Sequence, residues 1–188
     1  MRGATEARAS AAHKPDAPAI DRRAALPAAL AAGAVALTAR PLLTRVLLFK
    51  LRRDVRALNG GNIEPLLSSY AQDAVLRFNE GEHRWAGEHR GKHAIALFLQ
   101  SFVDAGLSGH VTELFVAGAP WRMTLIARFD DRSHGPDGAE IYANRTMLLA
   151  RTRWGRIVLH EDFYEDTQRI VALEQRLREG NAGRSPQP

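Results

Sequence analysis

The chain has 188 residues, of which 45% are apolar and 25% charged, a composition typical of one globular domain with an additional segment. It contains no cysteine, which excludes disulfides, thiol nucleophiles and thiolate metal sites and is compatible with the reducing cytoplasm, where we expect the protein. Residues 1–59 hold 11 basic and 4 acidic side chains, whereas residues 60–188 hold 15 and 17. Because this body is slightly acidic, we expect no nucleic-acid partner.

The first two segments of the chain differ in composition from the rest. Residues 1–23 are rich in Ala, Pro and charge without an apolar period, which predicts a disordered tail. Residues 24–41 form an Ala-rich apolar extension that is interrupted by a proline and a glycine. A membrane span needs about 20 strongly apolar residues, and the acidic residues near the start are unlike those of a signal peptide. The pattern therefore favours neither insertion nor secretion.

The segment from Pro41 to Gly60 is predicted to be a helix, because its apolar residues recur at helical spacing and basic residues lie between them. The apolar positions are Leu43, Val46, Leu47, Leu51, Val55 and Leu58. Two interpretations stay open. Peripheral membrane contact through residues 24–56 would use a basic amphipathic surface, and the favoured alternative is a first helix that packs on its own domain with a solvated arginine face.

The rest of the chain is predicted to contain three more helices and five strands. A short helix after Asn62 precedes a strand at 74–79, a Gly- and His-rich hairpin region and an amphipathic helix at 92–106. Four strands follow, at 111–118, 121–131, 140–152 and 156–166. A helix from residue 167 and a disordered tail at 181–188 end the chain. This order indicates the α+β class, with helices covering one face of a curved antiparallel sheet.

Four short motifs in this order resemble the nuclear transport factor 2 (NTF2) superfamily. They are the Gly-Asn-Ile-Glu helix cap, Tyr-Ala-x-Asp-Ala before a strand, Gly-Lys before the third helix and Gly-Arg-Ile at the start of the last strand. The superfamily includes SnoaL-like polyketide cyclases, ketosteroid isomerases and limonene-epoxide hydrolases. The resemblance implies a cone-shaped domain at 42–180, in which a curved antiparallel or mixed sheet wraps around the N-terminal helices. It also implies a pocket for a small apolar molecule and a homodimer formed through the sheet.

The residues that ketosteroid isomerases use are not matched in this sequence. By the resemblance, the general base would fall at Phe78, and phenylalanine cannot accept a proton. The two groups of the oxyanion hole would fall at Asp54 and Met147. A ketosteroid isomerase is therefore disfavoured.

The epoxide-hydrolase pattern is matched better. The strand "RFD" supplies Arg128 and Asp130, "HEDFY" supplies Asp162, and "RFN" supplies Asn79. The resemblance implies that these four catalytic candidates point into the cone. There Asp162 with Asn79 would deprotonate a water, Asp130 would protonate the leaving oxygen, and Arg128 would bridge the carboxylates. The expected pocket residues are Arg77, Tyr142, Asn144, His160 and Tyr164, although the family has a tyrosine where Arg77 stands.

Two functional hypotheses follow from these residues. One is a small-molecule hydrolase or isomerase that acts on an apolar substrate through an Asp-Arg-Asp pocket. The other is a non-catalytic ligand-binding or dimerisation module, in which Arg128 and Asp130 form an exposed ion pair at the end of a strand. No cofactor is expected. No metal site is expected either, because the spacing of His83, His89 and His93 fits no standard zinc pattern.

Overall fold

The computed structural model describes residues 22–182, with side chains described at 41–179. The chain divides into two units, residues 1–39 and 40–188. Helix α1 (Arg22–Asn59) begins in the first unit and ends in the second, and the predicted extension at 24–41 is helical. The rest of the two predicted tails, 1–21 and 183–188, lies outside the described residues. Among the helices described, none combines the length and apolarity needed to cross a bilayer.

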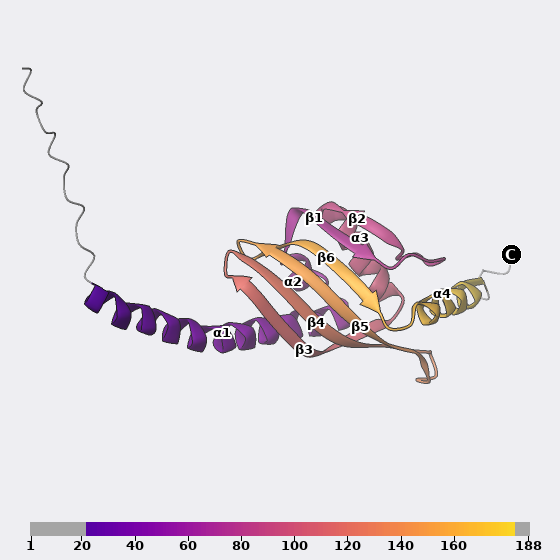
Figure 1. The fold of residues 1–188 in the computed structure, drawn as a ribbon. Helices are drawn as coiled ribbons and strands as arrows, with labels where there is room; N and C mark the ends of the chain where they lie inside the picture. Colours follow the sequence, from indigo (N-terminus) through magenta and orange to yellow (C-terminus); the bar gives the residue numbers. More distant parts are fainter. Residues whose placement is uncertain (1–21, 183–188) are drawn as a thin grey trace, which may run out of the picture. The chain divides into compact units, whose positions relative to one another are not determined.

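The second unit contains a six-stranded mixed sheet in the order β2-β1-β6-β5-β4-β3 (Figure 1). The strands are β1 (Tyr70–Phe78), β2 (Gly87–Arg90), β3 (Leu107–Ala119), β4 (Arg122–His134), β5 (Glu140–Arg153) and β6 (Arg156–Tyr164). Only β1 and β6 pair in parallel, and the other neighbours are antiparallel. The predicted α+β class with a curved sheet is confirmed. Several strands extend beyond their predicted bounds, since β1 begins at Tyr70 and β3 at Leu107.

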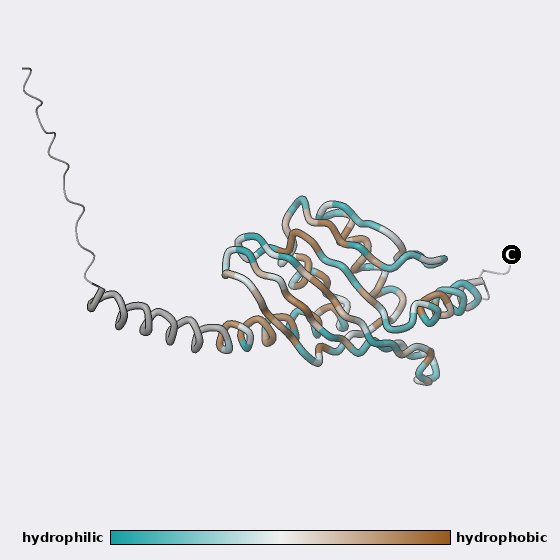
Figure 2. Tube along the Cα trace, viewed as in Figure 1, coloured by the Kyte–Doolittle hydropathy of each residue, from teal (hydrophilic) through white to brown (hydrophobic). Residues whose placement is uncertain are grey.

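Three helical segments cover the inner face of this sheet: the end of α1, α2 (Glu64–Leu67) and α3 (Gly91–Asp104). Helix α3 buries Ile95, Phe98 and Leu99, whose spacing places them on one side of the helix. The helix ends at Asp104, and Gly106, two residues later, has the left-handed backbone (φ 65°) that favours glycine after a helix. Figure 2 shows the apolar residues of α3 and the strands in brown.

The end of helix α1 packs on strands β3 and β4 of the sheet. Its Val55 is buried in a cluster with Val111 and Leu114 of β3 and with Ala127 and Phe129 of β4. A register shift after Val111 lets β3 keep Leu114 on this inner side. Apolar side chains thus make up most of the inner face of the sheet, and their burial favours packing of this side of each strand against the helices.

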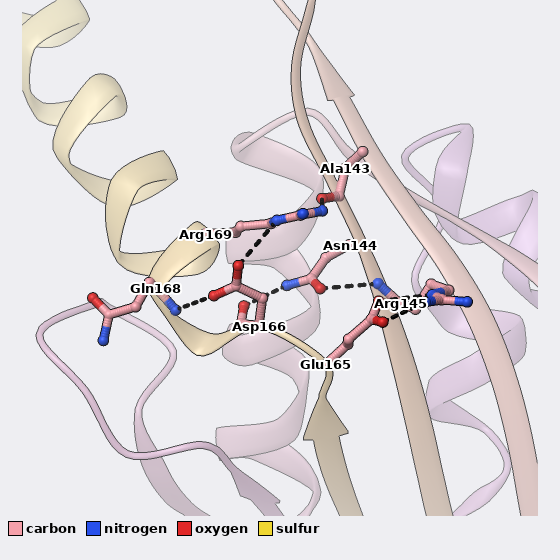
Figure 3. A network of polar contacts seen from close by, with 7 residues as sticks. All are labelled: Ala143, Asn144, Arg145, Glu165, Asp166, Gln168 and Arg169. Carbon is pink, nitrogen blue, oxygen red and sulfur yellow. Dashed lines mark hydrogen bonds and ion pairs between the residues drawn. The ribbon is translucent and has the colours of Figure 1, made fainter.

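Helix α4 (Thr167–Ala182) follows β6 and is held by a polar network at its start (Figure 3). Asp166 accepts hydrogen bonds from the backbone N–H of Gln168 (2.9 Å) and from Arg169 (3.1 Å). Further along, Ile170 and Leu173 are buried in the core. These contacts, together with the bond from Arg169 to the backbone oxygen of Ala143, fix the C-terminal helix beside the start of β5.

Candidate functional site

An apolar cavity of about 120 Å³ lies between the inner face of the sheet and the three covering helices. Most of its lining is aliphatic or aromatic, and no Lys or Arg is among the described residues that form it. Its polar side chains include Tyr70, Asp131, Thr146, His160, Asp162 and Tyr164. Such a lining suits a small, neutral, apolar molecule with a few polar atoms.

The strand β6 brings three of these groups to the cavity, because side chains two residues apart share a face. His160, Asp162 and Tyr164 lie opposite Ala150, Leu148 and Thr146 of β5. The prediction that His160 and Asp162 share a face is confirmed, and all three side chains line the cavity.

A hydrogen-bonded chain connects Tyr70, His160 and Asp162. The Tyr70 hydroxyl lies 2.5 Å from His160 Nδ1, and His160 Nε2 lies 2.9 Å from Asp162 Oδ1. Burial, and secondarily the charge of Asp162, raises the pKa of Tyr70 well above its usual value. The hydroxyl therefore stays protonated and donates a hydrogen bond to Nδ1. This leaves the imidazole proton on Nε2, where it is donated to Asp162.

A second polar group is centred on Asp131 of β4, whose side chain is buried. The Thr146 hydroxyl donates to Asp131 Oδ2 at 2.5 Å. Burial raises the pKa of Asp131 to about 7, and the charge of Asp162 contributes to the rise, while hydrogen bonds from Thr146 and Tyr164 oppose it. Near neutral pH, Asp131 can thus hold or release a proton in this apolar cavity. Burial also raises the pKa of Tyr164, so its hydroxyl stays protonated.

Arg128 and Asp130 lie on the outer face of the sheet, where they line a shallow surface groove with Arg145 and Glu165. The expectation that they point into the cone beside Asp162 is therefore wrong. The nearest carboxylate to Arg128 among its ion pairs is Glu113, at 3.7 Å. The physical reason is that Ala127 and Phe129 are apolar and take the buried face, so their neighbours in sequence must point outward.

Arg77 and Asn79 are also absent from the cavity lining. Leu76 and Phe78 occupy the inner face of β1 and are almost fully buried, which turns Arg77 to the outer side. There its guanidinium pairs with Glu88 and Glu161, each at 2.9 Å. The expectation that Arg77 and Asn79 point into the cone is therefore wrong, because neither residue lines the cavity.

Tyr142 and Asn144 are buried on the inner side of β5 but lie outside the cavity lining. Tyr142 belongs to the core cluster that includes Ile170. Asn144 Nδ2 donates to the backbone oxygen of Asp166 at 2.7 Å, within the network of Figure 3. Asn144 therefore anchors the start of α4 instead of facing the cavity as expected.

The sequence analysis does not identify five polar lining residues, namely Asn59, Tyr70, Ser108, Asp131 and Thr146. A signal for Asp131 was present, because it continues the alternation of Met123, Leu125, Ala127 and Phe129 on the apolar face of β4. Tyr70 lay outside the predicted strand. Among the described residues, no group of three His, Asp or Glu side chains is arranged to hold a metal ion.

The comparisons with known proteins agree with this architecture. The SnoaL-like domain family matches residues 51–160, which is more than half of the chain. No curated protein matches the sequence significantly. An NTF2-like protein from Burkholderia pseudomallei superimposes with a TM-score of 0.54 at 19% identity, covering 66% of this chain and 94% of its own.

A second similar structure is TerC, co-crystallised with polyporic acid. It gives a TM-score of 0.52 at 19% identity and covers 65% of this chain and 92% of its own. At these identities the two structures establish the fold alone. Together with the match over residues 51–160, they show that the chain belongs to the SnoaL-like domain family and has the NTF2-like fold.

Proposed function

We propose that the protein is a general acid–base enzyme that transfers a proton on a small, neutral, apolar substrate, as an isomerase or cyclase does. The observation that carries this proposal is the presence of two differently supported carboxyl groups in one apolar cavity. Asp162 accepts a hydrogen bond from His160, and Asp131 has a pKa near neutrality. Two carboxyl groups whose environments separate their protonation states are suited to act as base and acid.

Asp162 is the proposed general base. The chain from Tyr70 through His160 fixes the orientation of its carboxylate while leaving its second oxygen available to the substrate. In this mostly apolar cavity, few other donors compete with the substrate for that oxygen. Asp162 would accept a proton from a carbon atom beside a carbonyl group of the substrate.

Asp131 and Tyr164 are the proposed donors to the oxygen that becomes negative. Burial keeps part of Asp131 protonated at neutral pH, and the Tyr164 hydroxyl remains a donor at all physiological pH values. Groups that donate to a developing oxyanion in a site without bulk water stabilise the transition state strongly. The proton would then return to another atom of the same substrate, which completes an isomerisation or a ring closure.

Proton transfer is favoured here over epoxide hydrolysis. The hydrolase pattern needs Arg128, Asp130 and Asn79 beside Asp162, and none of the three lines the cavity. Proton transfer by the remaining pair, Asp162 and Asp131, requires only a substrate that has a carbonyl oxygen and an acidic C–H group beside it.

The test is the isosteric variant Asp162→Asn, measured against a panel of neutral enolisable ketones by loss of substrate and by solvent deuterium incorporation. Turnover should fall by about 100-fold or more, the range of a lost general base. Glu161→Gln on the outer face of the same strand is the matched control and should keep its activity. Undiminished turnover in Asp162→Asn would remove the proposal.

A second candidate function, as a dimerisation module, is supported by the outer face of the sheet. Phe115, Met147 and Phe163 are exposed there, and Met147 lies directly opposite Phe163 in the β5–β6 pairing. We propose that a second copy of the chain covers this face, since exposed apolar patches often mark interfaces. Phe163→Glu should convert a dimer into a monomer in sedimentation velocity, and a parent chain that is already monomeric contradicts the proposal.

A further inference from the structure

One face of α1 in the second unit carries exposed apolar residues and arginines. Leu42, Val46 and Phe49 recur at four and three residues, which places them on one side of the helix, and they are 56–67% exposed. The same helical face continues into Arg53 and Arg56, and Arg45 lies beside it. We call these six residues the α1 stripe.

The charge of the α1 stripe is positive. Between residues 40 and 59 the only acidic residue is Asp54, which is buried and pairs with Lys50 and Arg53. Arg52, at the edge of the stripe, donates to the backbone oxygens of Val111 and Thr112, both at 3.1 Å, and no carboxylate neutralises it in these bonds. The opposite face of α1 is already occupied, because Leu47, Leu48, Leu51 and Val55 pack on the sheet.

Two tight turns of the sheet add aromatic and basic groups. Trp121 lies between β3 and β4 and is 57% exposed, and Trp154 lies between β5 and β6 and is 79% exposed. The backbone N–H of Trp154 donates to the Trp121 oxygen at 2.9 Å, which ties the two turns together. The groove between them is also lined by Arg122, Arg151 and Arg153.

The stripe and the two turns lie toward the same end of the second unit. Asn59, at the end of α1, bonds to Gly109, and Arg52 bonds to Val111 and Thr112. Helix α1 and strand β3 therefore run in opposite directions, so the earlier residues of α1 lie toward the later residues of β3 and the turn that carries Trp121. In Figure 1 this part of α1 runs toward the end of the sheet at which the arrowheads of β3 and β5 lie.

We propose that this end of the domain binds the surface of a bilayer that contains anionic phospholipids. Exposed aliphatic side chains between arginines are the pattern by which helices lie in the interface of a membrane. Tryptophan prefers the level of the lipid headgroups, and clustered arginines attract anionic lipids. The surface contains all three features, and none of them is used by the cavity.

A second copy of the chain fits this surface less well. A symmetric contact through the α1 stripe would bring Arg45 and Arg56 of both copies together, and like charges oppose such a pairing. Anionic headgroups would instead neutralise these arginines while the acyl region receives Leu42, Val46 and Phe49.

The test is flotation of the full-length chain with vesicles of phosphatidylcholine alone and with vesicles that also contain about one third phosphatidylserine. The parent chain should float with the anionic vesicles and remain unbound with the neutral ones, and added salt should weaken the binding. The variant with Leu42→Gln, Val46→Gln and Phe49→Gln should lose at least about tenfold in partition coefficient. Leu97→Gln, at an equally exposed position on α3, is the matched control and should bind as the parent does.

Quenching of tryptophan fluorescence by brominated lipid gives an independent measurement. Trp85 is fully buried, so quenching should come from Trp121 and Trp154 and should disappear in the variant with Trp121→Gln and Trp154→Asn. Equal flotation of the stripe variant and the parent, or no binding to anionic vesicles, overturns the proposal. So does a lipid-free parent dimer that the stripe variant converts into a monomer, because a second copy would then cover the stripe.

Discussion

The inner and outer faces of β4 carry similar side chains in different environments. On the outer face, Asp130 and Arg128 are partly exposed, and the guanidinium lies 3.7 Å from Glu113. On the inner face, the neighbouring carboxyl group of Asp131 is 8% exposed and bonds to Thr146. The two aspartates are adjacent in sequence, yet burial raises the pKa of Asp131 to about 7.

This difference shows that the face of a strand determines what an ionisable residue can do. An exposed carboxylate beside an arginine is solvated, and such pairs stabilise the fold by only about 0–1 kcal/mol. A carboxyl group in an apolar cavity changes its protonation state near neutral pH, which is the property that acid–base chemistry requires. Three predictions test this comparison.

The largest effect is expected for turnover. Asp131→Asn removes the proposed acid while keeping the size of the side chain, and activity should fall by about 100-fold. Asp130→Asn, one residue away on the outer face, should change activity by less than about twofold. Steady-state kinetics on the substrate found for the parent measures both, and equal losses in the two variants would contradict the assignment of the faces.

The next effect concerns stability and pH. The unfolded chain releases the Asp131 proton near pH 3.8, whereas the folded chain keeps it until about pH 7. Between these values the folded state binds more protons, so the free energy of unfolding falls as the pH rises. Each pH unit between pH 3.8 and about pH 7 lowers the free energy of unfolding by about 1.4 kcal/mol, so the total decrease is about 4 kcal/mol.

Urea unfolding of the parent and of Asp131→Asn at several pH values measures this contribution. The free energy of unfolding of the parent minus that of the variant should decrease between pH 3.8 and about pH 7 and stay constant above about pH 7. Asp130→Asn serves as the control and should follow the parent. A parent-minus-variant difference that is independent of pH would show that Asp131 titrates normally.

The smallest effect is expected for Tyr70→Phe, which removes the donor to His160 Nδ1. The free energy of unfolding should fall by about 1 kcal/mol, the typical contribution of a buried hydrogen bond. Turnover should fall by about tenfold, because His160 is then free to change its tautomer and hold Asp162 less well. Nitrogen NMR of His160 should show the proton on Nε2 in the parent and a mixture of tautomers in the variant.

If His160 keeps a single Nε2–H tautomer in Tyr70→Phe, then Tyr70 has no positioning role. The NMR measurement does not depend on activity. It therefore separates the geometry of the chain from the proposed reaction.

Much of the fold could be predicted from the sequence. The change of apolar period from helical to alternating placed α3 and the four long strands within a few residues of their bounds. The pair His160 and Asp162 could be recognised because both follow one alternation on β6. Resemblance to a motif places Arg128, Asp130, Arg77 and Asn79 in the cone. This placement is wrong because it goes against the apolar alternation of the two strands, in which Leu76, Phe78, Ala127 and Phe129 take the buried face.

The sequence by itself determined the local elements, the α+β class and the chemical types available, because apolar periodicity and turn residues act over a few neighbouring positions. Only the tertiary structure decided which residues meet in the cavity. Tyr70 and His160 are 90 residues apart, and they become hydrogen-bonded partners only when β1 lies beside β6. The side of β4 that faces the helices is likewise set by the burial of Ala127 and Phe129, and that burial places Asp131, and not Asp130, next to the cavity.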